Sequence, residues 1–133
     1  MDNPLPILIV SCRPENRKTL TRVFDGLPIE SYSAPSIQEA RAALRSRGFS
    51  VIFCEERLGD GSYLELLHDV RSSAEAPPFI VMLCTGEWEE YLEALRLGAE
   101  EVLRCPLQPT DVDLALIHAM RAGAGKKEFA AHA

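Results

Sequence analysis

Residues 51–66, VIFCEERLGDGSYLEL, form the stretch that decides the fold. Four apolar residues run straight into two adjacent acids, Glu55 and Glu56. A Gly-Asp-Gly turn follows, and apolar residues then return at helical spacing. A short apolar run bounded by turn residues favours a buried strand, and the later spacing favours a helix. The stretch therefore predicts one β-α unit that carries two carboxylates at the carboxyl end of its strand.

The same alternation repeats along the whole chain. Strands are expected over 5–10, 29–33, 51–54, 79–84 and 101–104, and each is followed by a helical pattern. The strands expected over 5–10, 51–54 and 79–84 are apolar throughout, which is typical of a parallel sheet covered on both faces. With right-handed crossovers, the pattern predicts an α/β, doubly wound, flavodoxin-like fold with strand order 2-1-3-4-5.

Composition narrows the class of protein. The 133 residues suit one domain, and 47% hydrophobic with 26% charged residues is an ordinary globular balance. No apolar run is long enough for a membrane span and no secretory signal is visible, so a cytoplasmic location is expected. A net charge of −6 argues against nucleic-acid binding. The four cysteines are far apart without a C-x-x-C pair, which favours reduced thiols over zinc or disulfides.

The predicted topology also locates a candidate site. In doubly wound sheets, ligands bind beyond the carboxyl ends of the strands, where the strand order reverses. Here that crevice lies at the loops after the first and third strands, bordered by the ends of the fourth and fifth. The residues expected there are Ser11, Cys12, Arg13, Glu55, Glu56, Arg57, Leu83, Cys84, Cys105 and Pro106.

Three segments together resemble the receiver domain of two-component response regulators. They are ILIV (7–10) with its charged-Pro turn and helix, EERLGDGSYLELL (55–67) and EALRLGAEEVLRCPL (93–107). The resemblance covers roughly residues 6–122. It implies a receiver-like domain over 1–122, with a flexible tail or linker stub over 123–133, in a two-component or phosphorelay pathway.

The resemblance fails at the residues that carry the family's chemistry. It implies Glu55 at the phosphoacceptor position, Ser11 and Cys12 in place of two Mg²⁺-binding acids, Leu83 in place of a hydroxyl residue, and Cys105 in place of a lysine. Mg²⁺ prefers hard oxygen ligands, and a thiol is a soft one. Glutamate also moves the carboxylate, and a misplacement of about 1 Å can cost roughly 10²-fold in rate. We therefore expect a pseudo-receiver that is not an enzyme and has no cofactor or small-molecule substrate, with Mg²⁺ binding weak or absent.

Two interpretations of Glu55 stand side by side. It is either a permanent mimic of the phosphoryl charge or an acid that merely faces solvent at a strand end. The second is favoured, because Leu83 and Cys105 cannot donate a charge-assisted hydrogen bond and Val102 occupies the family's aromatic switch position. Glu56 and Arg57 are expected to be solvated loop charges.

The resemblance implies that function resides in protein contacts. The expected partner is a signalling protein, a histidine kinase, an output domain or a second copy of the chain. The family's usual partner face is formed by the fourth helix, fifth strand and fifth helix, with Trp88 and Val102 as candidate contacts. Helical spacing nevertheless places most of the stripe of Trp88, Tyr91, Leu92 and Leu95 in the core.

Two alternatives remain open. One is a working receiver that accepts a phosphoryl group at Glu55. The other is a redox or soft-metal sensor, since Cys12, Cys84 and Cys105 are expected at or near the crevice while Cys54 points into the core. The interaction module is the preferred hypothesis.

Overall fold

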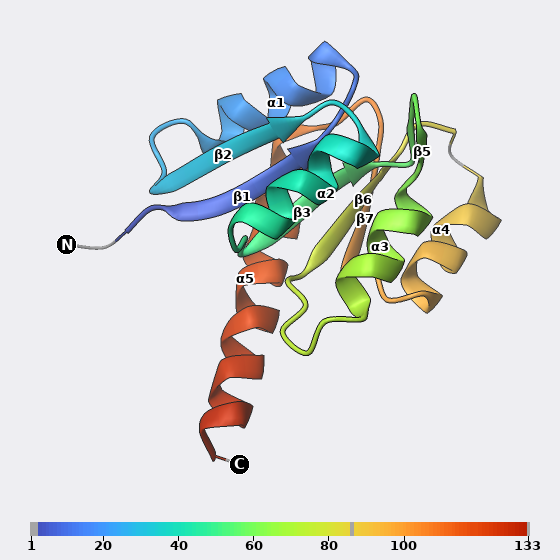
Figure 1. Cartoon of the computed structure of the whole chain (residues 1–133). Helices are drawn as coiled ribbons and strands as arrows, with labels where there is room; N and C mark the ends of the chain where they lie inside the picture. The colour runs from blue at the N-terminus through green and yellow to red at the C-terminus, as the bar shows by residue number, and fades with distance from the viewer. Residues whose placement is uncertain (1–2, 86, 133) are drawn as a thin grey trace.

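The computed structural model describes the backbone of residues 3–85 and 87–132, and the side chains of these residues up to Ala122. The strands are β1 (Leu5–Val10), β2 (Ile29–Ala34), β3 (Val51–Glu55), β4 (Arg57–Leu58), β5 (Gly61–Ser62), β6 (Phe79–Leu83) and β7 (Glu101–Arg104). The helices are α1 (Pro14–Phe24), α2 (Ile37–Ser46), α3 (Tyr63–Arg71), α4 (Trp88–Arg96) and α5 (Pro109–His132) (Figure 1).

Five strands form one parallel sheet in the order β2-β1-β3-β6-β7. Counted without the small β4–β5 hairpin, this is the predicted order 2-1-3-4-5, and the predicted fold class is confirmed. The hairpin itself was not expected from the sequence. It is a two-residue antiparallel pair that lies between β3 and α3, beside the carboxyl end of the sheet.

Two helical layers cover the sheet and bury its strands on both faces. The side chains of Leu8 and Val10 pack in the cluster that includes residues of α2, α3 and α4. Those of Ile7 and Ile9 pack in the cluster that includes residues of α1 and α5. This division follows from the two-residue period of a strand, and it explains why the strands read as continuous apolar runs.

Side-chain caps fix where two of the helices begin. Ser36 precedes α2, and its hydroxyl accepts a hydrogen bond from the backbone N–H of Glu39 at 3.1 Å. Ser62 precedes α3 and forms a reciprocal capping box with Glu65. Both sites follow the S-x-x-E pattern, which satisfies backbone N–H groups that a helix leaves free in its first turn.

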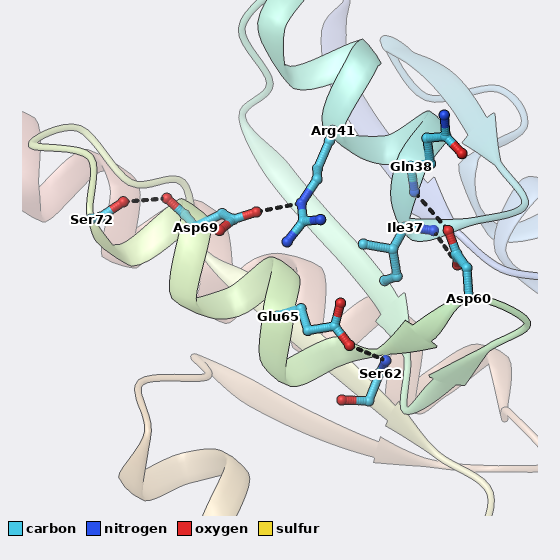
Figure 2. A network of polar contacts seen from close by, with 8 residues as sticks. All are labelled: Ile37, Gln38, Arg41, Asp60, Ser62, Glu65, Asp69 and Ser72. Atoms are coloured by element: carbon cyan, nitrogen blue, oxygen red, sulfur yellow. Dashed lines mark hydrogen bonds and ion pairs between the residues drawn. The ribbon is translucent and has the colours of Figure 1, made fainter.

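The hairpin turn is joined to α2 through Asp60 (Figure 2). Its carboxylate accepts hydrogen bonds from the backbone N–H groups of Ile37 at 2.8 Å and Gln38 at 3.0 Å. These two bonds, at the positive end of the helix, lower the pKa of Asp60. Farther along α2, Arg41 pairs with Asp69 of α3 at 2.6 Å. The segment between β3 and α3 is thereby anchored to α2.

The predicted core stripe on α4 is wrong for most of its members. Trp88 is 59% exposed, Leu92 47% and Leu95 37%, whereas Tyr91 is only partly buried. Ala94 is the residue of α4 that is fully buried, so the helix contacts the sheet along a narrow strip. The apolar spacing was recognised correctly, but it marks an exposed face.

The last two helices end in different ways. Gly98 ends the α4 segment with φ at +113°, a conformation that favours glycine. The backbone of 123–132 continues α5 and projects beyond the sheet, and the interpretation of this segment as a flexible tail or linker stub stays a prediction (Figure 1). Within the described residues, no helix has the length and apolarity needed to cross a membrane.

Candidate functional site

Glu55, the last residue of β3, is only 1% exposed. Its Oε2 accepts hydrogen bonds from the Ser11 hydroxyl and from Asn16 Nδ2, the latter at 2.8 Å. Its Oε1 accepts one from the backbone N–H of Cys12 at 3.0 Å, and the Cys12 thiol lies 3.4 Å away. The expectation that this acid faces solvent is therefore wrong. Its carboxyl group points into the space between β3 and the start of α1.

The surroundings of Glu55 explain how an acid can be buried there. A buried carboxyl group is tolerated where hydrogen bonds satisfy its oxygens. Its donors are Ser11 and Cys12, which lie between β1 and α1, and Asn16 in the first turn of α1. Among the described residues, every buried side-chain nitrogen and oxygen has a hydrogen-bond partner. The ion pairs found among the described residues do not include Glu55, so none of them places a cation beside its carboxyl group. Glu55 thus links β3 to the N-terminus of α1.

Asn16 was missed in the sequence analysis. It lies in the first turn of α1 and is 2% exposed. A signal for it does exist, since Asn16, Leu20 and Phe24 recur every four residues and are the buried side chains of this helix. A polar residue in register with an apolar stripe indicates a buried hydrogen-bond partner nearby.

Glu56 is the second acid of the pair, and its environment corrects another prediction. It is 9% exposed rather than solvated. Its carboxylate accepts hydrogen bonds from the backbone N–H groups of Cys84 at 2.8 Å and Thr85 at 2.9 Å, and from the Thr85 hydroxyl at 3.0 Å. Glu56 therefore holds the segment between β6 and α4. Arg57 is exposed, as expected.

At the end of β6, the residue beside the crevice is Cys84 and not Leu83. Leu83 is 1% exposed and packs in the layer of α2, α3 and α4. The Sγ of Cys84 lies 2.7 Å from the Sγ of Cys105, which follows β7 at a cis peptide to Pro106. Successive side chains of a strand point to opposite faces of the sheet. An error of one residue in the predicted strand end therefore assigns the wrong side chain to the crevice.

The cysteines lie where the sequence analysis placed them. Cys54 is buried, Cys12 is exposed, and Cys84 and Cys105 are half-buried. Burial and the hydrogen bond to Glu55 raise the pKa of the Cys12 thiol. Burial and the contact with Cys84 raise the pKa of Cys105 to about 12. Of the two partner-face candidates, Trp88 is exposed, but Val102 is 5% exposed and belongs to the core.

The residues of the crevice do not fit a magnesium ion. Mg²⁺ is held in proteins by one or two carboxylates, with waters and phosphate oxygens completing its octahedron. The two acids here engage different segments, because Glu55 contacts the loop before α1 and the first turn of that helix, whereas Glu56 contacts the segment before α4. Both already accept hydrogen bonds from the protein. Within the described residues, no group of three or more His, Cys, Asp or Glu side chains could hold a metal ion.

Two grooves on the surface lie away from Glu55. One, of about 620 Å³, is lined by the C-terminal parts of α2 and α3. The other, of about 720 Å³, lies between the β4–β5 hairpin, α3 and α4. Neither has Glu55 in its lining, in agreement with the burial of this acid.

Comparison with curated sequences identifies relatives among response regulators. The response regulator protein PilR of Pseudomonas aeruginosa is 28% identical over 100 residues, which are 75% of this chain and 22% of PilR. The acid tolerance regulatory protein ActR of Sinorhizobium medicae is 28% identical over 84% of this chain and 57% of ActR. The chain therefore spans less than two thirds of the length of these relatives. No family model matches the chain.

Solved structures agree with these relatives. A two-component response regulator from Clostridium difficile has a TM-score of 0.80 at 25% identity, covering 88% of this chain and 96% of that one. The signal receiver domain of an HD domain-containing protein from Pseudomonas fluorescens has a TM-score of 0.86 at 19% identity, covering 96% and 95%. A CheY-like receiver domain from Methanospirillum hungatei has a TM-score of 0.82 at 18% identity, covering 92% and 98%.

The chain thus has the five-stranded α/β fold of CheY-like receivers. Structural neighbours and the names of the sequence relatives together support a response regulator receiver domain as its class. Such domains are generally signalling modules and not enzymes.

Proposed function

We propose that this chain is a pseudo-receiver: a receiver-type signalling domain that acts through protein contacts and independently of phosphorylation. The observation that carries the proposal is the environment of Glu55. At the phosphoacceptor position, the carboxyl oxygens are buried and already accept hydrogen bonds from Ser11, Cys12 and Asn16. A phosphoryl donor would have to displace these partners before it reached the acid.

The remaining positions support the same conclusion. Phosphoryl transfer depends on positioning and on neutralising the charge of the transferring group. In the described part of the crevice, the strand ends supply two thiols, Cys84 and Cys105, and the carboxylates of Glu55 and Glu56 face different loops. A thiol is a weak donor and carries no positive charge. We therefore propose that Mg²⁺ binds weakly or not at all.

Phosphorylation can be tested directly by mass. The protein is incubated with a small phosphodonor and Mg²⁺, and its intact mass is measured. No stoichiometric addition is expected, and the Glu55→Gln variant should give the same result. A single added phosphoryl group that is absent from Glu55→Gln would refute the proposal and support the alternative of a working receiver.

The partner is proposed to be a signalling protein or a second copy of this chain, in the cytoplasm. The observation that supports this is a set of exposed apolar side chains on α4 and α5, the two helices that contact the edge strand β7, here called the exposed apolar face. It comprises Trp88, Leu92 and Leu95 on α4, and Leu114, Ile117 and Met120 on α5, which are between 37% and 59% exposed. Contiguous exposed apolar side chains are typical of protein interaction sites.

A further inference from the structure

The segments that follow β6 and β7 bring two thiols together. Leu83 of β6 is paired with Arg104 of β7, and the backbone N–H of Cys105 donates to the carbonyl of Leu83 at 2.8 Å. Cys84 and Cys105 are therefore the next residues on two neighbouring parallel strands. Neighbouring strands are about 4.8 Å apart, and the Cα atoms of a disulfide are typically about 4.4–6.8 Å apart. The backbone separation thus suits a disulfide.

The side chains are also oriented toward each other. The Sγ atoms of Cys84 and Cys105 are 2.7 Å apart. Because a disulfide bond is about 2.05 Å long, a shift of about 0.7 Å (2.7 − 2.05) would bring the two sulfurs to bonding distance. Neither thiol is fully buried, so a small reagent has access to the pair. The other two cysteines differ, since Cys12 contacts Glu55 and Cys54 is enclosed in the core.

We propose that Cys84 and Cys105 form a reversible redox pair, in which a small-molecule disulfide oxidises the two thiols to a bond between the β6–α4 and β7–α5 segments. Cys84 attacks the small disulfide, a mixed disulfide forms, and one thiol leaves with the proton. Cys105 then attacks the Cys84 sulfur, and the second thiol leaves. Two protein thiols and one small disulfide thus give one protein disulfide and two small thiols.

The burial of Cys105 determines the conditions under which the pair reacts. Its raised pKa keeps it a thiol at neutral pH, and the thiolate is the attacking species. Closure of the bond is therefore expected to accelerate as the pH rises toward 9.

The consequence of the bond follows from what it joins. Glu56 already holds the β6–α4 segment through the N–H groups of Cys84 and Thr85. α4 begins at Trp88, four residues after Cys84, and presents the exposed apolar face. Oxidation would link the segment before α4 covalently to the loop before α5. The pair would thereby couple the ratio of small disulfide to small thiol around the protein to the surface proposed for partner binding.

Peptide mapping tests the pair cleanly. Trypsin leaves the four cysteines in separate peptides, which are 1–17, 48–57, 72–96 and 105–121. The protein is equilibrated with mixtures of reduced and oxidised glutathione, quenched with an alkylating reagent, and digested. A linked pair of 72–96 with 105–121 is expected, together with an intact mass lower by two hydrogens and full reversal by excess reduced thiol.

Variants supply the controls. Cys12→Ser should retain the linked peptides, whereas Cys84→Ser and Cys105→Ser should lose them while keeping the circular dichroism spectrum of the wild type. The proposal is overturned if both peptides remain fully alkylated across all mixtures. It is equally overturned if 1–17 is the peptide that becomes linked. Because phosphorylation is measured separately, failure here leaves the pseudo-receiver proposal standing.

Discussion

At the scale of single residues, Asn16 shows how the crevice is held together. Its amide donates to Glu55 at 2.8 Å, and both side chains are buried. An acid at a strand end can stay in contact with water, but Glu55 does not. Its carboxyl group accepts hydrogen bonds from Ser11, Cys12 and Asn16, so it serves as a structural group of the interior.

Replacing Asn16 is therefore expected to destabilise the fold in a pH-dependent way. Asn16→Ala removes one buried donor and should lower the free energy of unfolding by about 1–3 kcal/mol. Asn16→Asp places a second carboxyl group against Glu55, and one of the two must then hold a proton, so its folded-state pKa is raised. Urea denaturation at pH 7 should show a loss of about 3 kcal/mol for this variant.

The sign of the pH effect provides the check. A carboxyl pKa that is raised by folding contributes stability below its unfolded value of about 4, and that stability is lost as the pH rises. The deficit of Asn16→Asp relative to the wild type should therefore shrink between pH 7 and pH 4. A deficit that stayed constant over this range would show that residue 16 does not face Glu55.

At the scale of elements, the chain pattern predicted the strands and helices well but not their mutual contacts. The bounds of β1 and β7 match the sequence prediction, because apolar runs and turn residues are local signals. Asn16 is hydrogen-bonded to Glu55, 39 residues along the chain, and Glu56 to Cys84, 28 residues along the chain. Local periodicity in the sequence does not reveal such distant partners. The sequence around Glu56 is typical of a charged loop residue. Its side chain is buried because the segment that follows β6 lies beside it in the fold.

The hairpin turn provides a test at this scale. Folding lowers the pKa of Asp60, since two backbone N–H groups of α2 donate to its carboxylate (Figure 2). A lowered pKa contributes stability above the unfolded value of about 3.9, and this contribution is lost as the pH falls through the folded pKa. Asp60→Asn should therefore be less stable than the wild type at pH 7, and the two should converge as the pH falls below the unfolded value of about 3.9.

The matched control for Asp60→Asn is Asp25→Asn, which removes the same charge at the C-terminal cap of α1. An acid at that end opposes the helix dipole, so its removal should be neutral or slightly stabilising. The measurement is the urea midpoint of each variant against pH. Equal losses for both variants at pH 7 would mean that net charge, and not the cap on α2, is responsible.

The thiol pair makes a second prediction about elements. A bond between Cys84 and Cys105 closes a loop of about 20 residues and should raise the free energy of unfolding by about 3 kcal/mol. The urea midpoint of the wild type should therefore be higher after oxidation by glutathione disulfide than in excess reduced thiol. Cys105→Ser should have the same midpoint in both conditions, and a wild type that also showed no difference would count against the bond.

At the scale of the whole molecule, the fold separates a closed interior from an open apolar face. The crevice at Glu55 is closed by hydrogen bonds, and the strands are buried on both sides. Six apolar side chains of α4 and α5 are exposed in contrast, and Trp88 among them is stacked on Tyr91 at a ring separation of 5.3 Å. If the pseudo-receiver proposal is right, signalling uses this surface, because the side chains of the crevice already bond to one another.

Trp88→Ala tests this division between interior and surface. Removing an exposed ring should change the free energy of unfolding by about 1 kcal/mol or less, mainly through loss of the contact with Tyr91. Binding should suffer more, because aromatic residues at the centre of an interface contribute most, and a tenfold loss corresponds to about 1.4 kcal/mol.

The measurements are self-association by sedimentation and the amount of partner retained from native cells. Leu27→Ala, a change at a 43% exposed residue between α1 and β2, is the control. If both variants bound as the wild type does, the α4 face would not be the contact surface, whereas a loss confined to Trp88→Ala would identify it.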